Sequence, residues 1–592
     1  MSRLEDPEKI PRVESDLSTA IDKHDHAASK VSLTADETAS HSNASSSIGR
    51  VSEDSIVLEP LDHAISPALQ EVIQIQTATS VGSSVARPAE FEVDFGDDDN
   101  PREWPFWFRA WTTFVISFCT WIIVLYSTTY TSSIPGLIKE FHVESETVAT
   151  LGVTTYLLGL GIGSLIWAPI SELYGRRIVY IICLTIFTLL ILPACLATSL
   201  TEILVIRFIG ALFGSALIAN SAGTVVDIST EENRALVLSL WSIAPLNGPV
   251  TGPVIGGFVY EYLGWRWDNW LILILSGAAT ISMLFTKETY APAILKAKAA
   301  RLRKETGDDR WWTRYDMNIS PSALIKLNLT RPFVLFFTEP ILWFFNLWIS
   351  IVYGILYLCF VAYPIIFTDH RGWGPGLTGL SFVGIGIGTT IGILGEPIWR
   401  RIINRHPKDP KTGRTPPEAT ARILAIGSIL TPIGELVFAW TSLPPTHWAV
   451  PIAFGIPFGL GNSFSFIYGS NYLAGAYGIY AASALAGNAV TRSILGGLLP
   501  LAGPKLYATL TPPWASTFLG LLEVALIPIP FVFWRYGEKI RAKSPAIRNL
   551  REDQERIERR AAKAQRRRER MQQKNAAESS DATVEAGMKE TV

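Results

Sequence analysis

The sequence predicts an all-α membrane protein in which twelve transmembrane helices form two six-helix lobes. Of its 592 residues, 48% are hydrophobic and only 18% are charged, and the mean hydropathy is +0.26. This balance is far from that of a soluble domain. A span needs about 20 mostly apolar residues, and twelve such runs follow residue 100. A long polar break after the sixth run divides them six and six.

The twelve predicted spans come in chain order, with boundaries set only by where the apolar runs end. They are 109–133, 146–170, 178–198, 202–227, 234–262, 269–287, 334–366, 376–400, 420–442, 447–470, 480–505 and 514–536. The predicted domains are a disordered cytosolic tail (1–99), an N-terminal lobe (100–288), a cytosolic linker with an amphipathic helix (289–333), a C-terminal lobe (334–537) and a basic cytosolic tail (538–592).

The distribution of charge predicts the orientation of the spans. The net charge of −2 conceals a strong segregation into the two tails and two internal loops. With a cytosolic amino terminus, the inner loops carry Arg176, Arg177 and the basic run 296–304, whereas the outer loops keep only isolated cations. This asymmetry predicts that both termini are cytosolic. The basic helix expected at 291–304 would lie along the membrane surface.

Residues 244–257 contain three prolines and four glycines in an uncharged apolar segment. In water each Pro costs about 3 kcal/mol and each Gly about 1 kcal/mol relative to Ala, whereas neighbouring membrane helices re-satisfy the freed backbone groups. Glycines that recur every four residues lie on one helix face and allow close packing. The segment resembles the fifth-helix antiporter motif of the major facilitator superfamily, through Gly248, Gly252, Pro253, Gly256 and Gly257. The resemblance implies the major facilitator fold.

The loop after the second span, Ala168 to Arg177, resembles the cytosolic loop motif of that superfamily, with Ala168 and Glu172 in place of the usual Gly and Asp. Arginines beside Gly175 can bind the carbonyl end of a helix and a facing acid. We expect a gating clasp of Glu172, Gly175, Arg176 and Arg177, with Asp227 as the facing acid. The alternative is that the two arginines only set the topology.

Two membrane residues are candidates for proton coupling. Arg207 resembles the fourth-helix Arg motif, and a guanidinium inside a bilayer costs several kcal/mol unless it is paired or hydrated. It stays charged, so it can bias the pKa of a carboxylate but cannot carry the proton itself. Glu435 in the ninth span is the most isolated acid of the second half, and Glu396 and Glu523 are weaker candidates. A packing role for Glu435 remains open.

The seventh and eleventh spans supply aromatic and polar groups that suit an amphipathic organic molecule. The candidate cavity residues are Asn346, Tyr353, Tyr357, Asn488 and Arg492. For any single aromatic residue, ordinary helix packing is the alternative. Together with the segment from Tyr477 to Ala486, they make this half similar to the fungal drug:H⁺ antiporter-1 family. The resemblance covers about residues 101–540.

These observations predict a secondary transporter, not an enzyme, that exports a toxin, secondary metabolite or drug in exchange for protons. We expect it to be a monomer in the plasma membrane, with the vacuolar membrane as an alternative. A polyamine exporter and a non-transporting membrane sensor are the rival functions. No Gly-x4-Gly-Lys-Ser/Thr loop for ATP is present, and we expect no cofactor, metal or nucleic acid. The four cysteines are read as packing residues, since they have no metal-ligand spacing.

Overall fold

The computed structural model describes residues 91–96, 99–230, 233–313, 315–316, 321–408 and 415–548. Throughout this part of the chain the regular structure is helical, apart from one isolated bridge between Glu92 and Trp312. The four cysteines are free and buried, in accord with packing roles. Most of the two tails, 1–90 and 549–592, lies outside the described residues.

In the first half of the chain, each predicted span coincides with one helix to within four residues, except that α3 continues eight residues beyond the predicted end at 133. These helices are α3 (Phe106–Phe141), α4 (Glu146–Tyr174), α5 (Arg176–Cys195), α6 (Leu200–Asp227), α7 (Arg234–Leu263) and α8 (Trp265–Leu284). The glycine-rich segment is continuous helix in α7, despite its three prolines. The expectation of a helix through this proline-containing segment is therefore met.

The second half is more broken than the sequence predicts. Its helices are α11 (Pro340–Pro364), the π-helical turn η2 (Ile365–His370), α12 (Pro375–Leu380), α13 (Val383–Leu394), α14 (Glu396–Asn404), α15 (Glu418–Thr441), α16 (Ala449–Tyr477), the 3₁₀ turn η3 (Gly478–Tyr480), α17 (Ala481–Leu526) and α18 (Pro528–Lys543). The predicted eighth span is thus built from α12, α13 and α14.

The number of membrane crossings agrees with the twelve predicted spans if the stretch 481–543 is counted as two crossings and α7 is added. Ten helical stretches of the described chain are long and apolar enough to cross a membrane, and the 63-residue stretch 481–543 counts as one of them. The backbone of that stretch is non-helical at Thr511 (φ 61°, ψ 152°), which lies between the predicted eleventh and twelfth spans. Helix α7 is not among the ten stretches. It has 30 residues, enough to cross a membrane, but its prolines and glycines lower its hydropathy.

The seventh span begins later than predicted. A separate helix, α10 (Pro321–Thr338), ends before Glu339, and α11 starts at Pro340. The carboxylate of Glu339 is buried and accepts hydrogen bonds from Ser544 Oγ at 2.6 Å and Ala546 N at 2.8 Å. Glu339 is extended (φ −109°, ψ 103°), as expected of the residue before a proline, and Pro340 suits the first turn of the next helix. The predicted start at 334 is therefore wrong, because 334–338 belong to α10.

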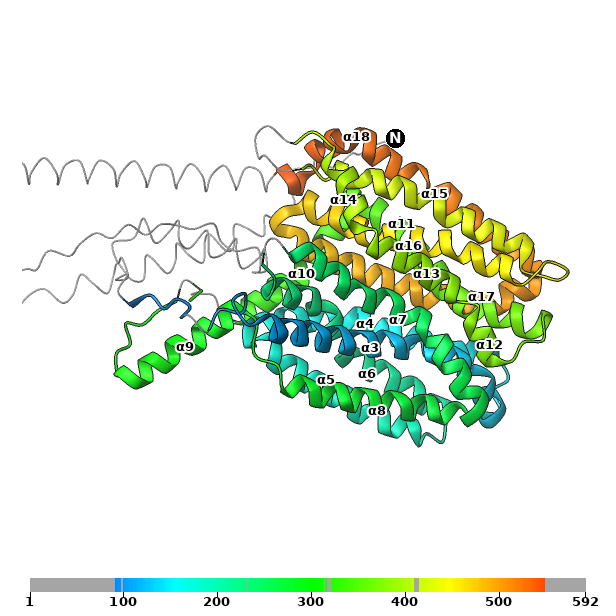
Figure 1. Ribbon diagram of the computed structural model, residues 1–592, viewed down its shortest axis with the longest axis horizontal. Helices are drawn as coiled ribbons and strands as arrows, with labels where there is room; N and C mark the ends of the chain where they lie inside the picture. Colours follow the sequence, from blue (N-terminus) through cyan, green and yellow to red (C-terminus); the bar gives the residue numbers. More distant parts are fainter. Residues whose placement is uncertain are drawn as a thin grey trace, which may run out of the picture. The chain divides into compact units, whose positions relative to one another are not determined.

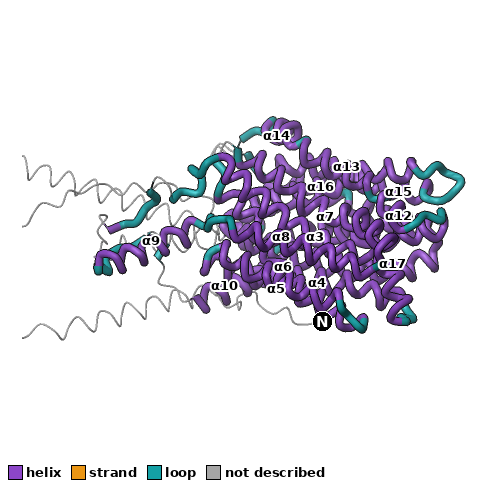
Figure 2. Tube along the Cα trace, turned by 60° about the horizontal axis from the view of Figure 1, so that its bottom comes forward, coloured by secondary structure: helices purple, strands orange, loops and turns teal. Residues whose placement is uncertain are grey.

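The contacts between helices define two lobes and their interface. Helix α3 packs along α7 and α4 along α6 in the first lobe, while α15 packs along α16 and α11 along α17 in the second. The lobes meet where α4 contacts α17 and where α7 contacts α12 and α13. Figures 1 and 2 place α9 and α10 at one end of the bundle and α12 at the opposite end.

The predicted linker contains a helix, α9 (Ala291–Thr306), whose apolar face is covered by protein. Leu295 and Ala299 pack in a small cluster with Val93, Tyr290 and Tyr315. The backbone of Val93 pairs with that of Trp312 (N to O, 2.8 Å). Residues 91–96 therefore do not belong to a disordered tail as predicted, because their alternating apolar side chains find a partner in the linker.

Candidate functional site

The glycine stripe of α7 forms a close contact with α3. A Cβ atom added at Gly248 would lie 3.0 Å from Val124 Cβ, and one at Gly256 would lie 3.0 Å from the Thr129 carbonyl oxygen. At Gly252 it would lie 3.0 Å from both Thr128 Cβ and the backbone nitrogen of Thr129. Each distance is shorter than ordinary van der Waals contact, so only glycine permits this approach. The predicted contact seam exists, and its partner is α3.

Another face of α7 joins the first lobe to the second. Added Cβ atoms at Gly257 and Gly379 would collide with the carbonyl oxygens of Pro375 and Pro253, respectively. The carboxylate of Glu261 accepts a hydrogen bond from Gly376 N at 2.8 Å. The lobes are therefore in direct backbone contact at the α12 end, and the antiporter segment contributes to both the seam and this closure.

The second lobe-to-lobe contact involves α3, α4, α11 and α17. Thr154 Oγ1 donates to the carbonyl oxygen of Gly497 at 2.7 Å. The hydroxyl groups of Ser127 and Tyr357 lie 3.0 Å apart. Matched glycine-interrupted helices from two halves are a pointer to a transport site between them, and in this structure such helices do line the interface.

A cavity lies between the two lobes, beside these contacts. It comprises about 800 Å³ of space not occupied by atoms, part of it open to solvent. Its walls come from eight helices, and they include Val124, Leu160, Ser164, Ile218, Pro245, Leu246, Pro249, Val250, Tyr353, Leu356, Tyr357, Ile385, Thr389, Asn462, Phe466, Ala489, Arg492 and Ser493. The largely apolar lining, with a few polar groups among it, is typical of a site for a small organic molecule.

Three of the five predicted cavity residues line this space, namely Tyr353, Tyr357 and Arg492. The other two, Asn346 and Asn488, do not. They are buried, and Asn488 Nδ2 donates to Asn346 Oδ1 at 2.8 Å. This hydrogen bond joins α11 to α17, and Asn346 Nδ2 is left without a hydrogen-bond partner.

Arg207 is enclosed within the first lobe and joins three helices. Its Nε donates to the Gly152 carbonyl oxygen at 2.9 Å, and its Nη2 donates to the Tyr126 and Ser127 carbonyl oxygens at 3.1 and 3.2 Å. Its Cζ also lies 4.4–4.8 Å from three tyrosine ring centroids, those of Tyr126, Tyr130 and Tyr156. Carbonyl oxygens and π faces thus satisfy the buried cation.

The acid that shares a cavity with Arg207 is Asp268, which the sequence analysis missed. Both line a small space together with Tyr126 and Asn269. Asp268 is 3% exposed; Ser133 donates to its Oδ2, and its Oδ1 has no hydrogen-bond partner. The predicted sixth span began at 269, so this carboxylate was assigned to the loop. An acid in the first turn of a helix also has an ordinary explanation in the helix dipole.

Glu435 lies on α15, within the second lobe. Its side chain is 2% exposed, its Oε1 has no hydrogen-bond partner, and its Oε2 is 4.0 Å from Cys359 Sγ. Glu523 is 3% exposed, and neither of its carboxylate oxygens has a partner. The weaker candidate Glu396 forms an ion pair with Arg400 at 2.6 Å. Glu435 and Arg207 therefore do not share a cavity.

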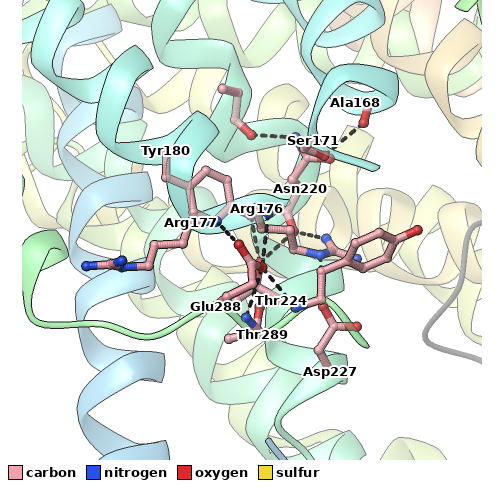
Figure 3. Close-up of polar contacts among 12 residues, drawn as sticks. Ala168, Ser171, Arg176, Arg177, Tyr180, Asn220, Thr224, Asp227, Glu288 and Thr289 are labelled. Atoms are coloured by element: carbon pink, nitrogen blue, oxygen red, sulfur yellow. Dashed lines mark hydrogen bonds and ion pairs between the residues drawn. The ribbon is translucent and has the colours of Figure 1, made fainter. Parts of the chain in front are cut away.

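The predicted clasp residues Arg176 and Asp227 form a buried ion pair. Arg176 Nε lies 2.8 Å from Asp227 Oδ2, and its Nη1 donates to the Asn220 carbonyl oxygen at 2.8 Å. Figure 3 shows these groups beside Thr224 at the end of α6. Breaking a buried pair by removing one partner costs about 3–5 kcal/mol, so this pair fixes the start of α5 against α6.

Glu288, a second residue that the sequence analysis missed, caps the N-terminus of α5. Its two carboxylate oxygens accept hydrogen bonds from Arg176 N at 3.1 Å and Arg177 N at 3.0 Å (Figure 3). Arg177 Nη2 donates to the Leu284 carbonyl oxygen at 3.0 Å, at the end of α8. Gly175 has φ 95°, and an added Cβ would meet Glu288 Oε2 at 2.6 Å. The turn therefore requires glycine for both its dihedral angle and its space.

The two lobes, the α7 seam and the central cavity define a class of protein: a two-lobed membrane transporter. The chain belongs to the Major Facilitator Superfamily, whose family model matches residues 116–491. It is therefore a multi-pass membrane protein that handles small molecules and is not an enzyme.

The relatives of this chain are fungal transporters of that superfamily, as the resemblance predicted. An ascochitine biosynthesis cluster MFS transporter of Didymella fabae is 39% identical over 453 residues, which cover 76% of this chain and 87% of the relative. The multidrug transporter mdrA of Aspergillus fumigatus is 37% identical over 462 residues, or 76% and 75%. The efflux pump MFS2 of Trichophyton rubrum is 38% identical over 443 residues, or 74% and 73%.

A solved structure of the xylose transporter XylE of E. coli matches with a TM-score of 0.52 and 15% identity, covering 72% of this chain and 98% of that one. This likeness shows the major facilitator fold.

Proposed function

We propose that this protein is a secondary active exporter that moves small organic molecules out of a fungal cell in exchange for protons. The observation that carries the proposal is the cavity between the lobes, which is lined by α7 of one lobe and α13 of the other, among other helices. Alternating access requires such a site at the interface of two bodies that rock against each other. Relatives named as efflux pumps and multidrug transporters support the outward direction of transport.

The nature of the cavity favours a toxin, secondary metabolite or drug over a polyamine. Tyr353, Tyr357 and Phe466 supply aromatic surface, and apolar residues form most of the remaining wall. Within the part of the chain that the structure describes, no Asp or Glu lines this cavity. A polyamine carries several positive charges, and buried charges need partners, so a site for it would need acids.

The proton route is proposed to include Arg207 and a carboxylate. Glu435 was chosen from the sequence, and its unpartnered oxygen in an apolar cluster supports it. Asp268 is a second candidate, because it shares a cavity with Arg207 and also has an unpartnered oxygen. A carboxylate that is protonated in one state and ionised in the other carries one proton per cycle.

The clasp is proposed to stabilise one state of the cycle from the α9 end of the bundle. Arg176, Arg177 and Glu288 connect the start of α5 to the end of α8, and Asp227 connects it to α6. Loss of these contacts would free the α5 end relative to its neighbours. We further propose that the protein lies in the plasma membrane and that this end of the bundle faces the cytosol.

The proposal is tested by comparing a deletion strain with its parent on a panel of toxicants and polyamines. Hypersensitivity to aromatic toxicants, rescued by the intact gene, is the expected result. Hypersensitivity to polyamines alone would favour the alternative exporter. Unchanged sensitivity to the whole panel, together with unchanged intracellular accumulation of every compound, would refute export of these classes.

A further inference from the structure

The charge of the central cavity comes from one residue. Arg492 of α17 lines the cavity, and among the described residues no other Lys, Arg, Asp or Glu does so. A guanidinium stays positive at every physiological pH. The site therefore presents one fixed positive charge to whatever enters it.

The guanidinium of Arg492 is held by rings, with no acid paired to it in the described structure. Its Cζ lies 4.5 Å from the Phe466 ring centroid and 5.0 Å from that of Tyr353. Its Nε is buried and has no hydrogen-bond partner. Two aromatic faces stabilise the charge in part, but they leave the Nε–H group without an acceptor. An uncompensated cation away from bulk water is costly unless it gains a partner.

A second free donor lines the same cavity. Asn462 of α16 is 7% exposed, and its Nδ2 has no hydrogen-bond partner. Two donors without acceptors, one of them charged, fit a ligand rich in acceptor oxygens. Carboxylate and sulfonate groups match the planar fork of a guanidinium, and such charge-assisted hydrogen bonds are among the stronger ones.

We propose that the transported compounds are aromatic organic anions whose acidic group binds Arg492 and whose planar body contacts Tyr353, Tyr357 and Phe466. This inference rests on the proposed function of the cavity and names the substrate class. The rings that flank Arg492 supply the surface for the apolar part of such a molecule. The anionic group supplies the acceptors that Arg492 and Asn462 lack.

An anionic substrate changes the electrical balance of the cycle. Outward movement of one monoanion and inward movement of one proton together transfer two positive charges inward. Export is then driven by the membrane potential as well as by the pH gradient. Export of a monocation for one proton would be electroneutral, so the voltage dependence distinguishes the two substrate classes.

The test compares three probes that share one ring system: 1-naphthalenesulfonate, 1-naphthalenesulfonamide and 1-naphthylmethylammonium. Binding of each to the purified full-length protein is measured at equilibrium. The sulfonate should bind the parent protein at least about tenfold more tightly than the ammonium, a factor that corresponds to 1.4 kcal/mol. Equal binding of the two, tighter binding of the ammonium, or no detectable binding of the sulfonate would overturn the inference.

Variants locate the effect at the residue. Arg492→Gln should weaken sulfonate binding about tenfold or more and change sulfonamide binding by less than about threefold, and Arg492→Lys should fall between. Arg405→Gln, which changes an exposed arginine at the end of α14, is the matched control and should leave all three unchanged. Equal loss in Arg405→Gln, or no loss in Arg492→Gln, would contradict the inference. Should Arg492→Gln not fold, the selectivity of the parent protein still decides.

Transport separates this inference from the proposed function. Sulfonate efflux from vesicles should accelerate when potassium and valinomycin are used to impose a membrane potential that is negative inside, because net positive charge then moves inward as the sulfonate leaves. Proton-driven export that is indifferent to voltage and prefers the ammonium would refute the anion site and leave the proposed exporter intact. Sulfonate binding at Arg492 without any proton-driven flux would refute the proposed exporter and leave the anion site intact.

Discussion

Replacement of Gly252 by a larger residue should stop transport without unfolding the protein. A Cβ at this position would lie 3.0 Å from Thr128 Cβ and Thr129 N, against 3.4–4 Å in ordinary contact. The added Cβ would also collide with Thr128 Oγ1, so even Gly252→Ala requires that hydroxyl to turn away and α7 to move away from α3 by about 0.4–1 Å, the difference between these distances. Gly252→Leu requires more. Overpacking of this kind costs about 1–3 kcal/mol.

That cost falls on the state in which α7 is closed against both α3 and α12, since Pro253 and Gly257 of α7 contact α12. A penalty of 1–3 kcal/mol lowers the population of one state by about 5- to 150-fold. Efflux from proteoliposomes at equal protein content should therefore fall in the order parent, Gly252→Ala, Gly252→Leu. Gly277→Leu on α8, where an added Cβ meets nothing within 4 Å, is the matched control. Unchanged efflux in Gly252→Leu would refute the seam argument.

Four other perturbations test the remaining parts of the account. Arg207→Ala should abolish efflux driven by a pH gradient in vesicles, and Arg207→Lys should restore it only in part, because an ammonium cannot reproduce the planar fork; full coupling in Arg207→Ala would sink the proton mechanism. Glu435→Gln and Asp268→Asn are assayed side by side. In one of the two variants, transport should no longer respond to pH while substrate binding persists. Normal pH dependence in both variants would place the proton site elsewhere. Asp227→Asn removes the counter-ion of a buried arginine and should lower the unfolding free energy by about 3–5 kcal/mol, measured as a lower melting temperature in detergent. The control, Glu140→Gln at the exposed pair with Arg266, should cost at most about 1 kcal/mol. Equal losses in the two variants would contradict the buried clasp. Tags at the two ends of the chain should be protected from protease on intact cells, and external cleavage of either would overturn the topology.

Apolar length and glycine spacing were sufficient to predict the helices, because a membrane span must satisfy all its backbone groups internally. Breaks that depend on side-chain partners were not predictable in this way. At the break between α10 and α11, the carboxylate of Glu339 is held by Ser544 and Ala546, which are distant from it in the sequence. The bend at Thr511, by contrast, falls where the apolar runs already separate.

The residues of the candidate site were predictable only where the type of a residue indicates whether it lines a cavity or packs against another helix. Arg492 and Tyr353 lie in the cavity, as a polar and an aromatic residue in a membrane helix suggest. Asn346 and Asn488 carried the same signal, yet they form a hydrogen bond with each other and do not line the cavity, and a sequence does not show which polar groups pair. Asp268 was hidden by its position at a helix start, where an acid needs no special explanation.

The central claim is that a proton gradient drives export through the cavity between the lobes. The most direct measurement is uphill transport in proteoliposomes of a compound to which the deletion strain is hypersensitive, with an imposed pH gradient and then with nigericin to collapse it. The account predicts accumulation beyond the equilibrium level while the gradient lasts, release after nigericin, and neither effect with the Gly252→Leu protein. Accumulation that stops at equilibrium and does not change when the gradient is removed would contradict it.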